Sequence, residues 1–194
     1  MIRRIVDIFV ACLLLVLSAP FWLLIALAIR LDSKGPVFYI QKRVGKGGRI
    51  FSLIKFRSMI DKAEEEGPLW ACENDKRITR VGRILRLLHL DELPQLLNII
   101  KGDMSLVGPR PERPEFVQQL EQAIPDYGLR HQVKPGITGW AQVNFPYAST
   151  FEESEEKLRY DLHYIERQSF WFDLKIIWLT GVKLARDIKK LKKR

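Results

Sequence analysis

The feature that most constrains this chain is a run of 22 residues without a charged side chain, from Ile8 to Ile29. About 20 apolar residues are needed to cross the hydrocarbon core of a bilayer. A cleaved signal peptide has a shorter apolar stretch, of about 7–15 residues, and a core helix of a soluble domain is rarely so long. The run therefore predicts a membrane helix in residues 1–30, followed by a separate domain in residues 31–194.

Two features bear on whether this helix crosses the bilayer. Arg3 and Arg4 precede the run and Arg30 and Lys34 follow it. Because basic residues stay on the cytoplasmic side, a simple crossing would leave one set on the wrong side. Pro20 lies inside the run and is expected to kink the helix. A helix that enters one leaflet and returns satisfies both flanks, and a kinked single span is the alternative that the residues leave open.

The charge balance indicates the kind of partner. The formal net charge is +9 and the isoelectric point is about 9.7, so nucleic acid, lipid head groups or a phosphorylated substrate is expected. Cys12 and Cys72 lie far apart. Their spacing predicts neither a zinc site nor a disulfide framework, which fits a reducing compartment.

Hydrophobic periodicity in residues 31–194 predicts an α+β fold that is predominantly helical. Val37–Gln41 and Ile50–Lys55 are rich in β-branched and aromatic residues, with glycines between them, and predict a small β-hairpin. Alternation along the second strand places Lys55 and Arg57 on one face, either at a site or on a solvated edge. Residues 60–80 are expected to form a polar, acidic helix and loop.

Three helices follow in this prediction. The first spans Thr79–Leu90, and the second begins with Asp91 as its N-cap and ends at Gly102. The third occupies residues 168–194, aromatic at its start and basic at its end. That composition is typical of a helix in the membrane interface, and a core helix with a basic tail is the alternative.

Asp91 and Glu92 are adjacent carboxylates that repel each other unless positive charge is close by. An Asp N-cap followed by a Glu is common at helix starts and needs no further function. Here, however, Arg86 and Arg110 lie nearby, and a helix start favours anions such as phosphates. Carboxylates, Mg²⁺ and arginines together are typical of phosphoryl transfer, and Asp can also act as the nucleophile.

Three segments carry a resemblance to a known family. "KFRSM", "LDELPQLLNIIKGDMSLVGPRPE" and "PGITGWAQVN", in this order after an apolar helix, resemble the bacterial sugar transferases, the monotopic polyprenyl-phosphate phosphoglycosyl transferases. The likeness covers Arg4 to about Leu184. The sequence departs from the family pattern at two points: Ala19 stands before Pro20 where the family has Ser, and "QVN" continues as "FPYAST" where many relatives have Gly and Arg.

The resemblance implies a mechanism and a set of roles. Asp91 matches the nucleophile that attacks the β-phosphorus of a UDP-sugar and releases UMP, and Glu92 matches the second member of the dyad. Both would hold Mg²⁺, while Lys55, Arg86 and Arg110 would surround the phosphates. Polyprenyl (undecaprenyl) phosphate would then accept the sugar phosphate, which makes the scheme ping-pong.

The resemblance also implies a location. The membrane helix would be re-entrant, broken at Pro20, with the catalytic domain on the cytoplasmic face of the bacterial inner membrane. Anionic lipids are expected partners, and a homo-oligomer is possible. The alternative from a different class is a membrane-tethered nucleic-acid-binding or interaction module, because Thr79–Gly102 superficially resembles a helix-turn-helix. Its scattered basic residues disfavour nucleic acid. The transferred sugar stays open, and no histidine is assigned a catalytic role.

Overall fold

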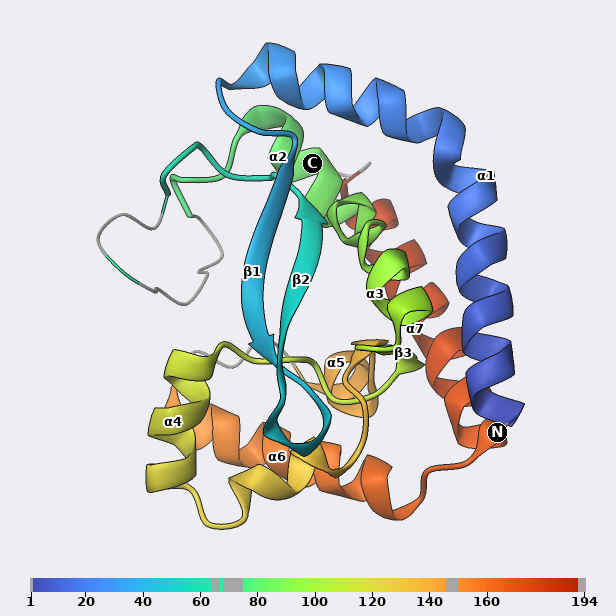
Figure 1. Cartoon of the computed structure of the whole chain (residues 1–194), viewed down its shortest axis with the longest axis vertical. Coiled ribbons are helices and arrows are strands. Elements are labelled where there is room, and N and C mark those ends of the chain that lie inside the picture. Colours follow the sequence, from blue (N-terminus) through green and yellow to red (C-terminus); the bar gives the residue numbers. More distant parts are fainter. Residues whose placement is uncertain (1, 64–66, 68–74, 146–149, 192–194) are drawn as a thin grey trace.

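The computed structural model describes residues 2–63, 67, 75–145 and 150–191. The fold is α+β and mostly helical, as predicted (Figure 1). Its elements in chain order are α1 (Ile2–Asp32), β1 (Phe38–Val44), η1 (Lys46–Gly48), β2 (Ile50–Phe56), α2 (Arg80–Leu87), η2 (Leu90–Glu92), α3 (Gln95–Lys101), β3 (Ser105–Val107), α4 (Pro114–Ala123), η3 (Tyr127–Gln132), β4 (Gly136–Thr138), α5 (Trp140–Asn144), α6 (Phe151–Glu166) and α7 (Phe170–Leu191).

Helix α1 forms the outer edge of the molecule and is bent near its middle (Figure 1). Pro20 lies inside it and cannot donate a backbone hydrogen bond. Ser18, one place before the position expected from the family, donates to the carbonyl of Leu15 at 3.2 Å. It also accepts from the indole Nε1 of Trp22 at 3.0 Å. Ser18 therefore supplies polar contacts beside the proline although Ala19 occupies the expected serine position.

Both ends of α1 are attached to the rest of the protein. Near its start, the guanidinium of Arg4 donates to the carbonyls of Ile99 and Ile100, at 2.6 and 2.9 Å, where α3 ends. At its other end, Asp32 Oδ2 accepts from the backbone N–H of Val81 at 2.8 Å, in the first turn of α2. The two ends of the apolar helix therefore contact neighbouring elements of one globular part.

Strands β1 and β2 pair antiparallel, from Phe38 opposite Phe56 to Val44 opposite Ile50. The hairpin is predicted correctly, but its first strand runs to Val44 instead of Gln41 and its second to Phe56. Leu53 on β2 packs against α3 in a cluster with Leu96 and Ile99. Because strand side chains alternate, Lys55 lies on the same face as Leu53 and thus on the side of α3.

A second sheet was not predicted. Strands β3 and β4 pair in parallel, and they bring the loop after β3 beside the segment that leads into α5. The backbones approach so closely that a Cβ on Gly108 would lie 2.3 Å from the carbonyl oxygen of Lys134. These short strands hold the proline-rich loop that carries Arg110 against the core.

The prediction of Asp91 as a helix N-cap is wrong. Helix α2 ends at Leu87, and His89 adopts a left-handed conformation with φ 54°. The chain therefore turns sharply, Asp91 and Glu92 lie in the short 3-10 helix η2, and α3 begins only after Pro94. Gly102 ends α3 with φ 101°, as predicted. Residues 64–66 and 68–74 of the expected acidic helix and loop lie outside the described residues.

Candidate active site

The two adjacent carboxylates lie inside the protein, between the hairpin and α3. Asp91 and Glu92 are 6% and 7% exposed. The turn at His89 redirects the chain after α2 so that η2 faces β2 and the loop after β3. Burial of two neighbouring acids is costly unless cations compensate for it.

Arg110 supplies part of that compensation. Its Nη2 lies 2.6 Å from Glu92 Oε1, in a charge-assisted hydrogen bond between two partly buried side chains. Pro109 and Pro111 flank Arg110 and limit the conformations of its loop. The loop thus presents the guanidinium to the dyad with little freedom to move away.

Lys55 and Arg86 approach from two other elements. Lys55 comes from β2 and Arg86 from α2, where its Nε donates to Ser58 Oγ at 2.8 Å. The charges of Lys55, Arg86 and Arg110 all act on Asp91. The five residues that the sequence singled out therefore gather in one place, from a strand, a helix, a 3-10 turn and a loop.

The acids and the lysine respond differently to burial. Burial and the neighbouring Glu92 raise the pKa of Asp91, against the three cations. Burial also opposes ionisation of Glu92, but Arg110 and Lys55 outweigh it and lower the pKa to about 2. Burial lowers the pKa of Lys55 to about 8. At neutral pH the site therefore holds a firmly ionised, arginine-bound glutamate beside a more basic aspartate.

This arrangement can perform nucleophilic chemistry on a phosphate. Within the described part of the chain no side chain or backbone group donates a hydrogen bond to the Asp91 carboxylate, so its oxygens are available. No group of three or more His, Cys, Asp or Glu side chains occurs there that would form a metal cage by itself. Mg²⁺ needs no such cage, because it keeps several waters and binds one or two carboxylates together with substrate phosphates. Asp91 and Glu92 fit that donor set.

The sequence did not indicate a second layer of charges behind the Arg110 loop. Arg130 in η3 is buried, donates to the carbonyl of Arg110 at 2.9 Å and pairs with Asp161 of α6 at 2.7 Å. Glu112 pairs with Lys157 of α6 at 2.5 Å. We call these four residues, Arg130, Asp161, Glu112 and Lys157, the loop clamp. Its members are far apart in sequence and lie in no motif, so only the fold brings them together.

The bacterial sugar transferase model matches residues 1–187. The chain belongs to this family. It is 47% identical to the UDP-N-acetylgalactosamine-undecaprenyl-phosphate N-acetylgalactosaminephosphotransferase of Aeromonas hydrophila, over 92% of this chain and 42% of that protein. It is 45% identical to the UDP-glucose:undecaprenyl-phosphate glucose-1-phosphate transferase of Escherichia coli K12, over 94% of this chain and 40% of that protein. A transferase of the same description from Caulobacter vibrioides is 46% identical, over 92% of this chain and 67% of that protein.

The chain therefore spans less than half the length of the first two relatives, and the matched part includes the apolar helix and the dyad. As in the sequence comparison with the family, the acidic pair and its three cations lie in the matched region. The loop clamp lies in the same family region, between residues 112 and 161.

Proposed function

We propose that this sugar transferase moves a sugar-1-phosphate from a UDP-sugar to polyprenyl phosphate, with release of UMP, through a phosphosugar bound to Asp91. The observation that carries the proposal is the buried Asp91 carboxylate, which is unpaired within the described chain and faces the positive charges of Lys55, Arg86 and Arg110. The names of its relatives support the donor and acceptor classes.

In the first half-reaction an Asp91 oxygen attacks the β-phosphorus of the donor. A bond forms between that oxygen and phosphorus, and the phosphoanhydride bond breaks, so the electron pair leaves with UMP. Lys55, Arg86 and Arg110 neutralise charge on the phosphate oxygens. Mg²⁺ bound by Asp91 and Glu92 would neutralise further charge on the diphosphate. Glu92, held by Arg110, stays ionised and keeps its orientation.

In the second half-reaction a phosphate oxygen of the polyprenyl phosphate attacks the same phosphorus. The bond between phosphorus and Asp91 breaks, and the electron pair returns to the carboxylate. The products are polyprenyl-diphosphate sugar and the original enzyme, so no further reactant is required. The relatively basic Asp91 is a good nucleophile in the first step, and the surrounding cations stabilise it as a leaving group in the second.

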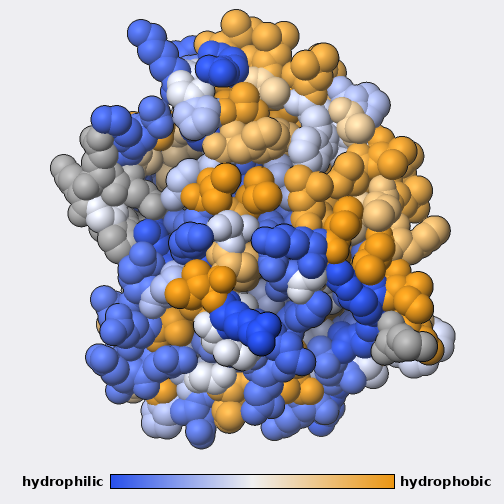
Figure 2. All heavy atoms as spheres, viewed as in Figure 1, coloured by the Kyte–Doolittle hydropathy of each residue, from blue (hydrophilic) through white to orange (hydrophobic). Residues whose placement is uncertain are grey.

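The placement of apolar surface supports a membrane position for the site. Apolar side chains follow α1 along its whole length, as the orange band in Figure 2 shows. We propose that α1 is re-entrant, since both of its ends bind the same globular part. Trp171 and Trp178 on α7 are 77% and 71% exposed, which favours an interfacial helix over a core helix. The catalytic domain would then lie on the cytoplasmic face of the inner membrane.

The sugar is not part of the proposal. The chain is almost equally identical to relatives whose names specify N-acetylgalactosamine and glucose. Residues 146–149, within the segment that departs from the family pattern, lie outside the described residues. A panel of UDP-sugars is therefore needed as donor.

The test is to incubate the full chain in detergent with Mg²⁺ and each UDP-sugar, without acceptor. We expect a burst of UMP close to the enzyme concentration and a phosphosugar adduct on the peptide containing Asp91, found by mass spectrometry. Asp91→Asn should show neither, whereas the control Asp126→Asn, at an exposed turn residue, should show both. An adduct on another residue, or UMP release that needs the acceptor, would contradict the covalent scheme. Binding of nucleic acid without any UMP release would favour the alternative class.

A further inference from the structure

An open hollow lies at the end of α3, away from the dyad. Its volume is about 530 Å³, which is within the range of small-ligand sites. Lys46, Arg49 and Lys134 line it, together with Gly102 and Asp103. Asp91 precedes α3 and Gly102 follows it, so the hollow and the dyad lie at opposite ends of this helix. We call this hollow, with Lys46, Arg49, Lys134 and the neighbouring Arg4, the basic hollow.

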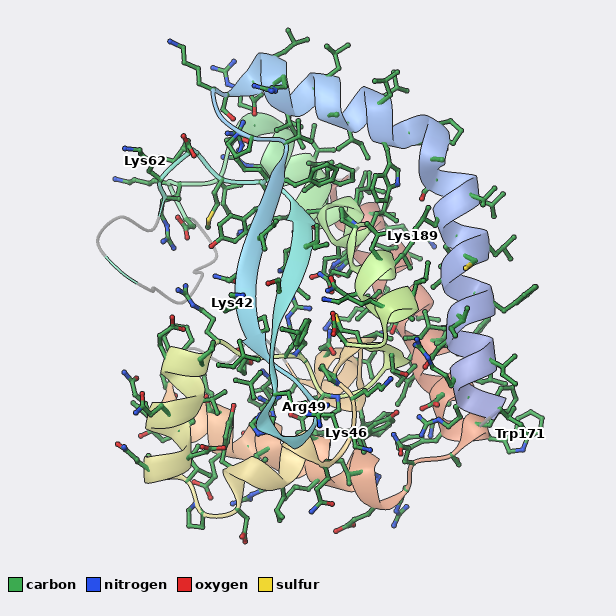
Figure 3. The ribbon with its side chains drawn as sticks, in the orientation of Figure 1. Lys42, Lys46, Arg49, Lys62, Trp171 and Lys189 are labelled. Atoms are coloured by element: carbon green, nitrogen blue, oxygen red, sulfur yellow. The ribbon has the colours of Figure 1, made fainter. Side chains whose placement is uncertain are left out.

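The positive charges of this hollow converge. A Cβ built on Gly102 would lie 3.4 Å from Arg4 Nη2 and 3.6 Å from Lys134 Nζ. Burial, Arg4 and Lys46 together lower the pKa of Lys134. Lys46 and Arg49 extend from the tip of the hairpin, where Figure 3 shows them side by side. Like charges gathered in this way favour an anion among them.

Among the described residues, Asp7 and Asp103 act on Lys134, but neither forms an ion pair with it. Asp103 also lines the hollow, but it has other partners: its Oδ2 lies 3.5 Å from Lys101 Nζ and accepts a hydrogen bond from the side-chain amide of Asn98. No carboxylate of the described chain forms an ion pair with Lys46, Arg49 or Lys134. Gly47 and Gly48 at the hairpin tip have no atoms near their missing side chains, so backbone is open to a ligand there.

The hollow adjoins apolar surface of α1. Arg4 lies between Ile2 and Ile5, which are 70% and 60% exposed. The exposed Trp171 lies beside the same end of α1 (Figure 3). Hydrophilic side chains meet the orange band of α1 directly on this face (Figure 2). A ligand in the hollow can therefore place a charged group among the cations and an apolar chain along α1.

We propose that the basic hollow binds the phosphate of an anionic phospholipid head group, whose acyl chains lie along the start of α1. Such a site would fix the rotation of the domain on the membrane surface, beyond the general attraction of a basic protein to anionic lipid. It does not depend on the proposed function, because it uses none of the dyad or its three cations.

The experiment measures lipid binding by calorimetry, with the full chain in an uncharged detergent and without donor or Mg²⁺. The probes are dioctanoyl phosphatidylglycerol, dioctanoyl phosphatidylcholine and inorganic phosphate. The test variant carries Lys46→Gln, Arg49→Gln and Lys134→Gln. The control variant carries Lys62→Gln and Lys76→Gln, at exposed lysines, of which Lys62 lies at the other end of the molecule (Figure 3).

We expect the test variant to bind phosphatidylglycerol at least about tenfold more weakly than wild type and control. A charge-preserving variant with Lys46→Arg, Arg49→Lys and Lys134→Arg should keep the affinity. Phosphatidylcholine should bind weakly to all proteins. Equal phosphatidylglycerol affinity in test variant and control would overturn the site. Inorganic phosphate that binds as tightly as phosphatidylglycerol would overturn the lipid as its ligand.

Discussion

Lys55 is the residue at which burial and charge compete most directly. The side chain extends from β2 toward two buried acids, and burial lowers its pKa to about 8 although Glu92 opposes that shift. Arg110 and Arg43 lower it further. A lysine in this setting is charged at neutral pH but loses its proton within the range of an ordinary assay. Its charge is thus available to the phosphates only below that pKa.

This predicts a bell-shaped pH dependence of kcat/KM. As pH rises through about 8, Lys55 becomes neutral and the rate should fall. As pH falls, Asp91 takes up a proton at a pKa above that of an ordinary aspartate, and the nucleophile is lost. Lys55→Arg should retain activity and remove the alkaline limb, because arginine stays charged. Lys42→Arg, on the exposed side of β1, is the control and should leave the profile unchanged. An alkaline limb that persists in Lys55→Arg would exclude Lys55 as its source.

At the scale of elements, the position of α2 depends on one close approach. A Cβ on Gly82 would lie 1.9 Å from the carbonyl oxygen of Ser58, so only glycine fits between α2 and the segment after β2. The same segment binds Arg86 through Ser58 Oγ at 2.8 Å. Because Gly82, one turn before Arg86, has no side chain, α2 can approach the segment after β2 closely enough for Arg86 to reach Ser58.

Gly82→Ala is expected to displace α2 and with it Arg86. The reason is that the obstructing atoms belong to the backbone of Ser58 and cannot rotate away. We expect kcat to fall by at least about tenfold, and the free energy of unfolding to fall by about 1–3 kcal/mol. Gly181→Ala, where nothing lies near the added methyl, is the control within another helix: it should leave kcat unchanged and should not lower stability, because alanine is favoured over glycine inside a helix. Normal turnover in Gly82→Ala would show that Arg86 tolerates the shift.

The loop clamp works at the same scale, because it joins the Arg110 loop to η3 and α6. Arg130 and Asp161 are each almost completely buried, and their pair lies 2.7 Å apart. Removing one charge of a buried pair leaves the other without compensation, which typically costs about 3–5 kcal/mol. The clamp therefore links the stability of the domain to the placement of Arg110.

Asp161→Asn should lower the free energy of unfolding by about 3–5 kcal/mol, as measured by denaturant titration in detergent. The matched control is Glu155→Gln on the same helix, which removes an exposed pair with Arg159. A pair of that kind contributes only about 0.2–0.5 kcal/mol. If the two substitutions had equal effects, the clamp would not stabilise the domain in the way that its burial implies.

At the scale of the whole molecule, local signals in the sequence predicted the apolar helix, the hairpin, the last helix and the acidic pair with Arg86 and Arg110, and the resemblance to the family added Lys55. Apart from Lys55, each of these is a pattern within a short window or a charged residue near the dyad in sequence. The loop clamp gave no such signal, since Arg130 and Asp161 lie 31 positions apart. The predicted start of α3 was wrong. Aspartate is a common N-cap residue, which favoured a start at Asp91, but the turn at His89 and Pro94 moves the start of the helix to Gln95.

The attachments of α1 determine how the whole molecule sits in the bilayer. Arg4 binds the end of α3 and Asp32 binds the start of α2, so both ends of α1 are held by one globular part. A helix that crossed the bilayer would have to break one of these attachments. A helix bent near Pro20, where Ser18 donates a hydrogen bond to the carbonyl of Leu15, keeps both attachments.

Ile2→Cys and Lys34→Cys, made separately after replacement of Cys12 and Cys72 by serine, report the two ends of α1. In oriented membrane vesicles, a membrane-impermeant maleimide should label both positions from the same side, which is the cytoplasmic side. Cys12, in a variant in which only Cys72 is replaced by serine, should resist the reagent from either side, although its side chain is exposed on the protein surface, because lipid covers it. Labelling of positions 2 and 34 from opposite sides would show that α1 crosses the bilayer, and one of the two attachments would then have to be absent in the membrane.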